Sequence, residues 1–327
     1  MPRCGDDEVI LKLAACGICR TDLKCYESGQ RDLVLPRILG HELTGTVFAV
    51  GRKVKGVDPG LRVQVAPGLS CGHCRYCRQG RDNLCHNLKI IGFNYDGGFA
   101  QYMVIPAQGI KRGILNEIPP FLSFAEASLT EPLACCVHMQ EMLAVRPGES
   151  ILIAGCGRLG ILNAKLAALR GAEKIIMLEP DRQRRALASR LGMRYCLDGA
   201  NPAVVDEIFD LTGGQGVDLA IPCCPDPAAM ETSLQALAKG GRLGFFSSLY
   251  PEKGLPFNLN LVHYKEITVA GGYGCTLKDN RTALDLLASG AIGVKGIVTR
   301  EIPLEEVEAG LFMLKEKAAL SVIITFD

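Results

Sequence analysis

The chain has 327 residues, about twice the length of one compact domain, so we expect two domains. Hydrophobic residues make up 48% and charged residues 22%, which suits buried cores and excludes a disordered chain. The net charge of +1 gives no electrostatic reason to expect nucleic acid or an anionic membrane as a partner.

The amino-terminal third is predicted to be a β-rich unit. Residues 8–15 are mostly apolar and typical of a strand, and short β-rich runs separated by glycines continue through 43–66. Residues 67–92 then become rich in Gly, Cys and Arg. No stretch approaches the ~18 apolar residues of a spanning helix, and the first residues contain no apolar signal core, so we expect a cytoplasmic protein.

The remainder of the chain alternates strands and helices. Ser123 is expected to cap a helix over 124–144 that is interrupted at Pro132. Short apolar runs with amphipathic helices between them predict a parallel sheet with right-handed crossovers. The expected strands are 150–154, 174–178, 219–222 and 242–247. The tail is expected to contain helices at 281–289 and 304–315 and a strand at 321–326.

Four of the fifteen cysteines are predicted to hold a structural zinc ion. Cys71, Cys74, Cys77 and Cys85 have the spacing C-x2-C-x2-C-x7-C, and four thiolates close a tetrahedral shell that leaves no position for a substrate. Free thiols in a loop are the simpler alternative, and an iron–sulfur cluster would use the same ligands. Nothing else in the sequence indicates electron transfer, so zinc is favoured.

Three further residues offer the ligand types of a catalytic zinc site. Cys19 follows the first predicted strand, His41 lies in a Gly-His-Glu sequence, and Glu131 lies in Thr-Glu-Pro-Leu. A lone histidine is more often packed in a core than bound to a metal. Together, however, the three residues provide a thiolate, an imidazole and a carboxylate, and three protein ligands with one open position are typical of catalytic zinc.

A glycine-rich motif predicts a dinucleotide-binding turn. The motif G-x-G-x-x-G consists of Gly155, Cys156, Gly157, Arg158, Leu159 and Gly160. It follows the predicted strand 150–154 and opens an apolar helix, which is the context that such a turn requires. The pyrophosphate of the dinucleotide would lie at the helix N-terminus. A second glycine-rich turn, 213–216, opens no predicted helix and is interpreted as an ordinary loop.

Glu179 is predicted to select between the two nicotinamide dinucleotides. It lies 19 residues after Gly160, where an acidic residue hydrogen-bonds the adenosine ribose and repels a 2′-phosphate. This favours NAD over NADP. Three arginines follow closely and are the alternative, because they could reach a 2′-phosphate: Arg182, Arg184 and Arg185.

Over essentially its whole length, the sequence resembles the zinc-containing medium-chain alcohol dehydrogenases. The segments that carry the resemblance are Gly-His-Glu-Leu-Thr-Gly at 40–45, Gly51, Val54, the cysteine cluster 71–85, 96–102 and the glycine motif. Segments 131–134 and 263–266 are similar to the polyol and threonine dehydrogenase branch. The resemblance implies an α/β protein. Its GroES-like β-rich catalytic domain would comprise 1–131 with 276–327, and its Rossmann domain, a doubly wound parallel sheet, 132–275.

The resemblance also implies which residues bind the catalytic zinc. The ligands would be Cys19, His41 and Glu131, with Glu42 as an alternate ligand or a support for one. The competitors for the third position are Cys135 and Cys136, which follow Glu131 by about one helical turn.

Proton transfer and phosphate binding are implied for three neighbouring residues. Thr21 would pass the substrate proton outward, and a turn threonine bonded to its own backbone is the alternative. Relatives place a histidine where Lys24 stands, so release would go through Lys24, the cofactor ribose or water. Arg20 would contact cofactor phosphate, or would simply be solvated beside the metal.

The implied function is that of a zinc-dependent oxidoreductase with two zinc ions per chain, which transfers a hydride from a secondary alcohol to NAD. A polyol, cyclitol or sugar-derived alcohol is the first expectation, and a threonine-type amino alcohol is the alternative. A non-catalytic zinc-binding module would leave the glycine motif unused, and a zinc-free reductase would lack the second ligand set. Relatives are homo-oligomers, so we expect a dimer or tetramer with a strand region at 259–269 as the shared edge.

Overall fold

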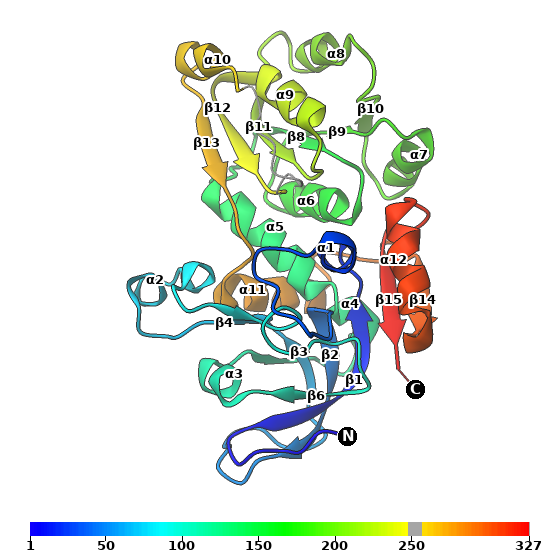
Figure 1. The fold of residues 1–327 in the computed structure, drawn as a ribbon. Coiled ribbons are helices and arrows are strands. Elements are labelled where there is room, and N and C mark those ends of the chain that lie inside the picture. Colours follow the sequence, from blue (N-terminus) through cyan, green and yellow to red (C-terminus); the bar gives the residue numbers. More distant parts are fainter. Residues whose placement is uncertain (248–256, 327) are drawn as a thin grey trace. The chain divides into compact units, whose positions relative to one another are not determined.

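The computed structural model describes residues 1–247 and 257–326, which fold into two compact units (Figure 1). The first unit consists of Met1–Ala134 and Gly274–Asp327, and the second of Cys135–Tyr273. Within the described residues, no helix is both long enough and apolar enough to cross a membrane.

A mixed seven-stranded sheet forms the centre of the first unit. Its strand order is β14-β15-β1-β2-β3-β7, and β6 also pairs with β1. These strands are β1 (Val9–Gly17), β2 (Glu42–Val50), β3 (Arg62–Val65), β6 (Tyr102–Ile105), β7 (Leu115–Glu117), β14 (Arg300–Pro303) and β15 (Val322–Thr325). In β1, Leu11 and Leu13 enter the core whereas Lys12 between them is exposed, which is the two-residue period of a strand with one buried face.

Short helices and a two-stranded ribbon complete the first unit. They are α1 (Arg20–Ser28), β4 (Gly68–Leu69), α2 (Arg75–Arg78), η1 (Asp82–Leu84), β5 (Lys89–Ile90), α3 (Ala107–Arg112), α4 (Phe124–Ala127), α11 (Leu277–Ala288), η2 (Leu304–Glu306) and α12 (Val307–Lys315). A smaller core, which contains Ile18, Leu311 and Val322, packs the carboxy-terminal segment against the start of the chain.

The second unit contains a parallel sheet of six strands in the order β10-β9-β8-β11-β12-β13. The strands are β8 (Ser150–Ala154), β9 (Lys174–Leu178), β10 (Tyr195–Leu197), β11 (Val217–Pro222), β12 (Leu237–Phe245) and β13 (Thr268–Gly271). The helices are α5 (Thr130–Met142), whose residues up to Ala134 belong to the first unit, α6 (Arg158–Leu169), α7 (Arg182–Arg190), α8 (Val204–Leu211), α9 (Pro227–Gln235) and α10 (Leu259–Tyr264). The predicted strand–helix alternation and α/β fold class are confirmed.

Three predicted elements differ from the structure for local reasons. The helix expected over 124–144 is two helices, and Pro132 lies in the first turn of the second one, where its missing N–H costs nothing. Ser123 does cap the first helix through Glu126. Residues 259–269 are not one strand: α10 begins there because Asn258 caps it.

The third difference concerns the helix expected at 281–289, which begins earlier, at Leu277. Thr276 and Asp279 form a capping box, in which each side chain accepts a hydrogen bond from the other residue's backbone N–H. The 213–216 turn lies between α8 and β11 and opens no helix, as expected.

Strands β1 and β2 approach each other closely at Gly45, and a substitution there tests whether this close approach is required. A Cβ at Gly45 would lie 2.4 Å from the Lys12 carbonyl oxygen, whereas a Cβ at Gly68 would meet only a Leu88 methyl group at 3.7 Å. Gly45→Ala is therefore expected to lower the free energy of unfolding by about 1–3 kcal/mol, and Gly68→Ala by less than about 0.5 kcal/mol. Urea denaturation of both variants measures this, and equal losses would contradict the steric argument.

Candidate zinc and dinucleotide sites

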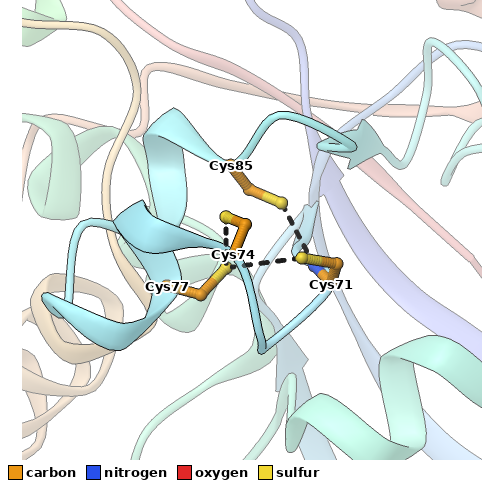
Figure 2. Close-up of side chains that lie close together, drawn as sticks. All are labelled: Cys71, Cys74, Cys77 and Cys85. Carbon is orange, nitrogen blue, oxygen red and sulfur yellow. Dashed lines mark hydrogen bonds between the residues drawn. The ribbon is translucent and has the colours of Figure 1, made fainter.

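Four cysteine side chains of the first unit converge between β4 and β5 (Figure 2). The Sγ atoms of Cys71, Cys74, Cys77 and Cys85 all lie within 4.8 Å of one another, with Cys71–Cys77 at 3.9 Å and Cys74–Cys77 at 3.5 Å. A zinc tetrahedron with Zn–S bonds of about 2.3 Å has edges of about 3.8 Å. The separations therefore fit a four-thiolate zinc site.

Backbone amides favour the thiolate form in this cysteine cluster. The Cys71 N–H points to Cys85 Sγ at 3.2 Å. Backbone hydrogen bonds at Cys77 and His86 lower the pKa of Cys74 to about 6, whereas burial raises the pKa of Cys85 to about 12. Because thiolates are the metal ligands, Cys74 is ready to bind at neutral pH and Cys85 releases its proton when a cation arrives.

A second group of metal-binding side chains forms where α1 and β2 begin. Cys19 is the N-cap residue of α1, His41 directly precedes β2, and Glu42 is its first residue; one ligand atom from each lies within 4.8 Å of the others. His41 is 6% exposed and Glu42 is fully buried. A half-buried thiolate with a buried imidazole and a buried carboxylate fits zinc, because a cation balances their charge. The lack of a side chain at Gly17 leaves space for the Glu42 carboxylate, since a Cβ there would lie 2.2 Å from Glu42 Oε2.

The buried carboxylate of Asp22 fixes the geometry of this group. Its Oδ2 accepts the Cys19 backbone N–H at 2.8 Å, while Cys19 Sγ accepts the Thr21 N–H at 3.4 Å. Its Oδ1 accepts the Gly40 N–H at 3.3 Å and lies 3.3 Å from His41 Nδ1. The role of Asp22 was not predicted from the sequence. The available signal was an acidic residue three positions after Cys19, which is the spacing of a capping box.

The same carboxylate controls the protonation of His41. Burial disfavours the charged imidazole, but the charge of Asp22, its hydrogen bond and the neighbouring Cys19 together outweigh burial, so the pKa of His41 is raised well above 6.5. In the metal-free chain the raised pKa therefore favours the protonated imidazole. A metal ion that binds to it must displace this proton.

Glu131 is not a member of the Cys19 group. It is the second residue of α5 and is 9% exposed. Its carboxylate lies within 4.8 Å of the Sγ atom of Cys135, one turn later on the same helix, and, within the first unit, of the Sγ atom of Cys275. Cys136 is buried and its Sγ contacts the Leu159 carbonyl oxygen at 3.7 Å, so it is engaged elsewhere. The structure therefore brings together Cys19, His41 and the alternate ligand Glu42.

The glycine motif forms the turn between β8 and α6. Gly155 has φ of +110°, a conformation that favours glycine, and a Cβ at Gly160 would lie 1.8 Å from the Gly155 carbonyl oxygen. Gly157 is the N-cap of α6 and supplies no side-chain acceptor, and Arg158 begins the helix as a buried residue. A helix N-terminus of this kind can bind an anion such as pyrophosphate.

Glu179 supports this turn directly. It follows β9 and is 4% exposed. Its Oε2 accepts the Cys156 backbone N–H at 3.0 Å and its Oε1 accepts the Asp181 N–H at 3.2 Å. The carboxylate thus holds the glycine turn in place, a role that the sequence spacing did not reveal.

The arginines that follow Glu179 differ in where their side chains lie and in the contacts that they make. Arg185 donates to the carbonyl oxygens of Glu179 and Pro180 and to the Asp198 carboxylate, so its guanidinium is already engaged. Arg182 is exposed at the start of α7. Arg184 Nη1 lies 3.8 Å from the point where a Gly157 side chain would begin, which places it beside the glycine turn.

Both units match known families. Residues 5–113 match the alcohol dehydrogenase GroES-like domain, and residues 159–289 match the zinc-binding dehydrogenase domain. L-threonine 3-dehydrogenase of Pyrococcus furiosus is 38% identical over 306 residues, 92% of this chain and 86% of that protein. Sorbitol dehydrogenase of Bacillus subtilis is 32% identical over 314 residues, 94% of this chain and 86% of that protein.

A solved structure has the same fold. A Sinorhizobium meliloti protein bound to NADP and described as a zinc-binding dehydrogenase has a TM-score of 0.92 and 31% identity, covering 99% of this chain and 94% of that one. These similarities and the fold define a zinc-binding, NAD(P)-dependent alcohol oxidoreductase. The chain belongs to the zinc-containing medium-chain alcohol dehydrogenase family. The family and enzyme class predicted from the sequence are confirmed.

The two cysteine-containing groups should respond differently to substitution. Cys74→Ser is expected to lower the free energy of unfolding by roughly 3 kcal/mol or more, because it opens a closed structural metal shell. Cys19→Ser keeps an N-cap acceptor for α1, so it should retain stability and lose turnover. Zinc content, urea denaturation and activity measure this. Equal effects of both substitutions on folding would refute the division of roles.

Asp22→Asn tests the support that Asp22 gives to the Cys19 group. We expect zinc affinity to fall roughly 10- to 100-fold, because residues that orient a metal ligand contribute on that order. Glu27→Gln on the same helix removes only an exposed ion pair with Lys315 and should change little. Competition with a chelator measures affinity, and equal affinities of the two variants would contradict the prediction.

The pH dependence of zinc uptake follows from His41. Its pKa is raised, so at limiting zinc the occupancy should fall as the pH decreases through that pKa. In Asp22→Asn the stabilising charge is absent, so this fall should move to lower pH. An unchanged midpoint would show that Asp22 does not set the protonation of His41.

Proposed function

We propose that the protein oxidises a secondary alcohol by transferring its hydride to NAD, with two zinc ions per chain. The observation that carries this proposal is the donor set of Cys19, His41 and Glu42 in the first unit, together with the glycine turn of the second unit that Glu179 holds. The first choice of substrate is a polyol, a cyclitol or a sugar-derived alcohol. Hydride transfer to NAD needs both a metal-binding donor set and a dinucleotide-binding turn.

The catalytic ion would be held by Cys19, His41 and either Glu42 or Glu131. When bound, it acts as a Lewis acid that lowers the pKa of the substrate hydroxyl. The structure favours Glu42 over Glu131, because only Glu42 has a ligand atom within 4.8 Å of both other ligands. The four-cysteine cluster would hold the structural ion.

Thr21 is the residue we propose for carrying the hydroxyl proton outward. Its backbone N–H contacts Cys19 Sγ, so it belongs to the same turn as the donor set. Lys24 lies three residues later, on a neighbouring position of α1, and could receive the proton in place of water or the cofactor ribose. Arg20, the exposed first residue of α1, is the candidate for a cofactor phosphate.

Glu179 should set the choice of cofactor. We expect NAD to be preferred over NADP by at least about tenfold, since a carboxylate near the ribose repels a 2′-phosphate and Arg185 is already engaged. Glu179→Ser should narrow that preference. Glu173→Ser, at the opposite end of β9, is the control and should leave it unchanged. A wild-type preference for NADP would show that Arg182 and Arg184 dominate.

The activity itself is tested by NAD reduction with polyols, cyclitols, sugar phosphates and L-threonine. Thr21→Ala should lower turnover by on the order of 10²-fold, as expected for a positioned proton-transfer group. Lys24→Ala should cost much less, because water and the ribose can replace it. The proposal fails if the zinc-loaded protein reduces NAD with none of the secondary alcohols in the panel. Equal losses of turnover in Thr21→Ala and Lys24→Ala would make Lys24 the proton acceptor.

L-threonine is the second candidate substrate. The specific observation in its favour is the 38% identity to L-threonine 3-dehydrogenase of Pyrococcus furiosus. Its hydroxyl is also that of a secondary alcohol, so the same donor set would serve it. A kcat/KM for L-threonine above that for every polyol in the panel would select this candidate.

We further propose a cytoplasmic homo-oligomer, a dimer or tetramer, joined through the edge strand β13. Val269 on this strand is 41% exposed, and Leu259 and Tyr264 on α10 are 72% and 77% exposed. Fifteen cysteines, all among the described residues and none in a disulfide, suit a reducing compartment. A monomeric mass in light scattering at micromolar concentration, or recovery outside the cytoplasm, would contradict this proposal.

A further inference from the structure

A buried hydrogen-bond network joins three segments of the second unit. Asn163 on α6 is fully buried, and its Nδ2 donates to the Leu159 carbonyl oxygen at 3.1 Å and to Cys223 Sγ at 3.4 Å. Gln140 on α5 is also fully buried. Its Nε2 donates to the Asn163 carbonyl oxygen at 2.8 Å and to Asn163 Oδ1 at 3.1 Å. The network therefore connects α5, the helix that follows the glycine turn, and the chain just after β11.

The contacts fix the direction of both amide groups. If the Gln140 amide were reversed, its oxygen would face the Asn163 carbonyl oxygen, and two acceptors cannot form a hydrogen bond. A reversed Asn163 amide would face the Leu159 carbonyl oxygen in the same way. In this arrangement Gln140 Oε1 is buried and has no hydrogen-bond partner among the described residues. Such an acceptor is unfavourable for folding, so stability alone does not account for the network.

Cys223 lies where the strand order of the parallel sheet reverses. From β8 the chain continues through β9 to β10, whereas β11 lies on the other side of β8 (Figure 1). Pro222 of β11 pairs with Ala154 of β8, and the Cys223 N–H donates to the Ala154 carbonyl oxygen at 2.7 Å. In open α/β sheets, ligands bind beyond the carboxyl ends of the strands at such a reversal. Cys223 and Gly155 are the first residues beyond the two strands that border this position.

The order of the strands separates the two halves of the dinucleotide. Glu179 follows β9, on one side of β8, where an acidic residue bonds the adenosine ribose. The glycine turn after β8 would bind the pyrophosphate. The nicotinamide half would therefore lie on the other side, at the end of β11. There, a Cβ at Gly155 would lie 3.6 Å from Cys224 Cβ and 3.7 Å from the Cys223 carbonyl oxygen, which is van der Waals distance.

We propose that Asn163 is a positioning residue for the nicotinamide half of the cofactor and acts through Cys223. The Asn163 amide holds Cys223, and with it the backbone of 223–224, against the glycine turn. Gln140 keeps that amide in the direction that the contact requires. The adenosine half depends instead on Glu179, which bonds the turn from the β9 side. This inference rests on the proposed function, because it requires the dinucleotide to bind at the glycine turn.

Two ligands separate the halves of the cofactor in an experiment. ADP-ribose contains the adenosine, the pyrophosphate and the second ribose, and NADH adds the nicotinamide ring to them. In the zinc-loaded full-length protein, Asn163→Ala should lower the affinity for NADH by about tenfold and that for ADP-ribose by less than about twofold. Glu179→Ser should lower both affinities. Calorimetric titration measures both ligands and needs no alcohol substrate.

Cys223 provides a matched pair of variants. Cys223→Ala removes an acceptor of the Asn163 amide and should weaken NADH binding, whereas Cys223→Ser supplies a new acceptor and should recover most of it. Ser233→Ala removes a different buried hydrogen bond of the second unit, to the Ala229 carbonyl oxygen, and should change neither affinity. The Cys223 pair remains readable if Asn163→Ala fails to fold, and urea denaturation identifies that failure.

The split between the two ligands decides the proposal. Equal losses of NADH and ADP-ribose affinity in Asn163→Ala would overturn it, because the network would then support the turn as a whole. Equal NADH affinities of Cys223→Ala and Cys223→Ser would overturn the role of Cys223. If the wild-type protein bound neither ligand, the proposed function itself would fail, and this result differs from every outcome in which only the variants lose NADH.

Discussion

Buried carboxylates that accept backbone N–H groups hold the functional turns of both units in place. In the first unit Asp22 bonds the N–H groups of Cys19 and Gly40, which brings two segments 21 residues apart to one metal-binding group. In the second unit Glu179 bonds the N–H of Cys156 in the glycine turn. A hydrogen bond to a charged acceptor contributes about 1.5–3 kcal/mol, whereas an unpaired buried carboxylate is strongly unfavourable, so each turn and its carboxylate stabilise one another.

A third carboxylate connects the four-cysteine cluster to the carboxy-terminal part of the first unit. Asp82 lies in η1 between Cys77 and Cys85, and its Oδ2 accepts the Leu277 N–H at 3.3 Å at the start of α11. Burial raises the pKa of Asp82, which this hydrogen bond partly opposes. The cluster therefore does more than close its own loop, because the peptide between two of its ligands also fixes the first turn of a helix that is distant in sequence.

The features predicted from the sequence are those encoded by local spacing. The four cysteines, the glycine motif and the strand–helix alternation each lie within a short segment, so their patterns are visible without tertiary information. The choice between Glu42 and Glu131 depended on how separate segments meet, and spacing cannot supply that. Asp22 was missed because a capping acid has an ordinary sequence context. The strand predicted over 259–269 failed because apolar content outweighed the helix-capping signal of Asn258.

The pairing of β1 with β15 has a consequence for the order of folding. Ala15–Gly17, just before the metal-binding turn, pair with Ile323–Thr325, whereas all of the second unit lies between them in sequence. During synthesis the second unit is therefore complete before β15 leaves the ribosome, and this edge of β1 waits with unpaired backbone groups. An open strand edge is a template for intermolecular pairing. This edge of β1 stays open until β15 is released, and a chaperone that covers β1 during that interval would protect the nascent chain from aggregation.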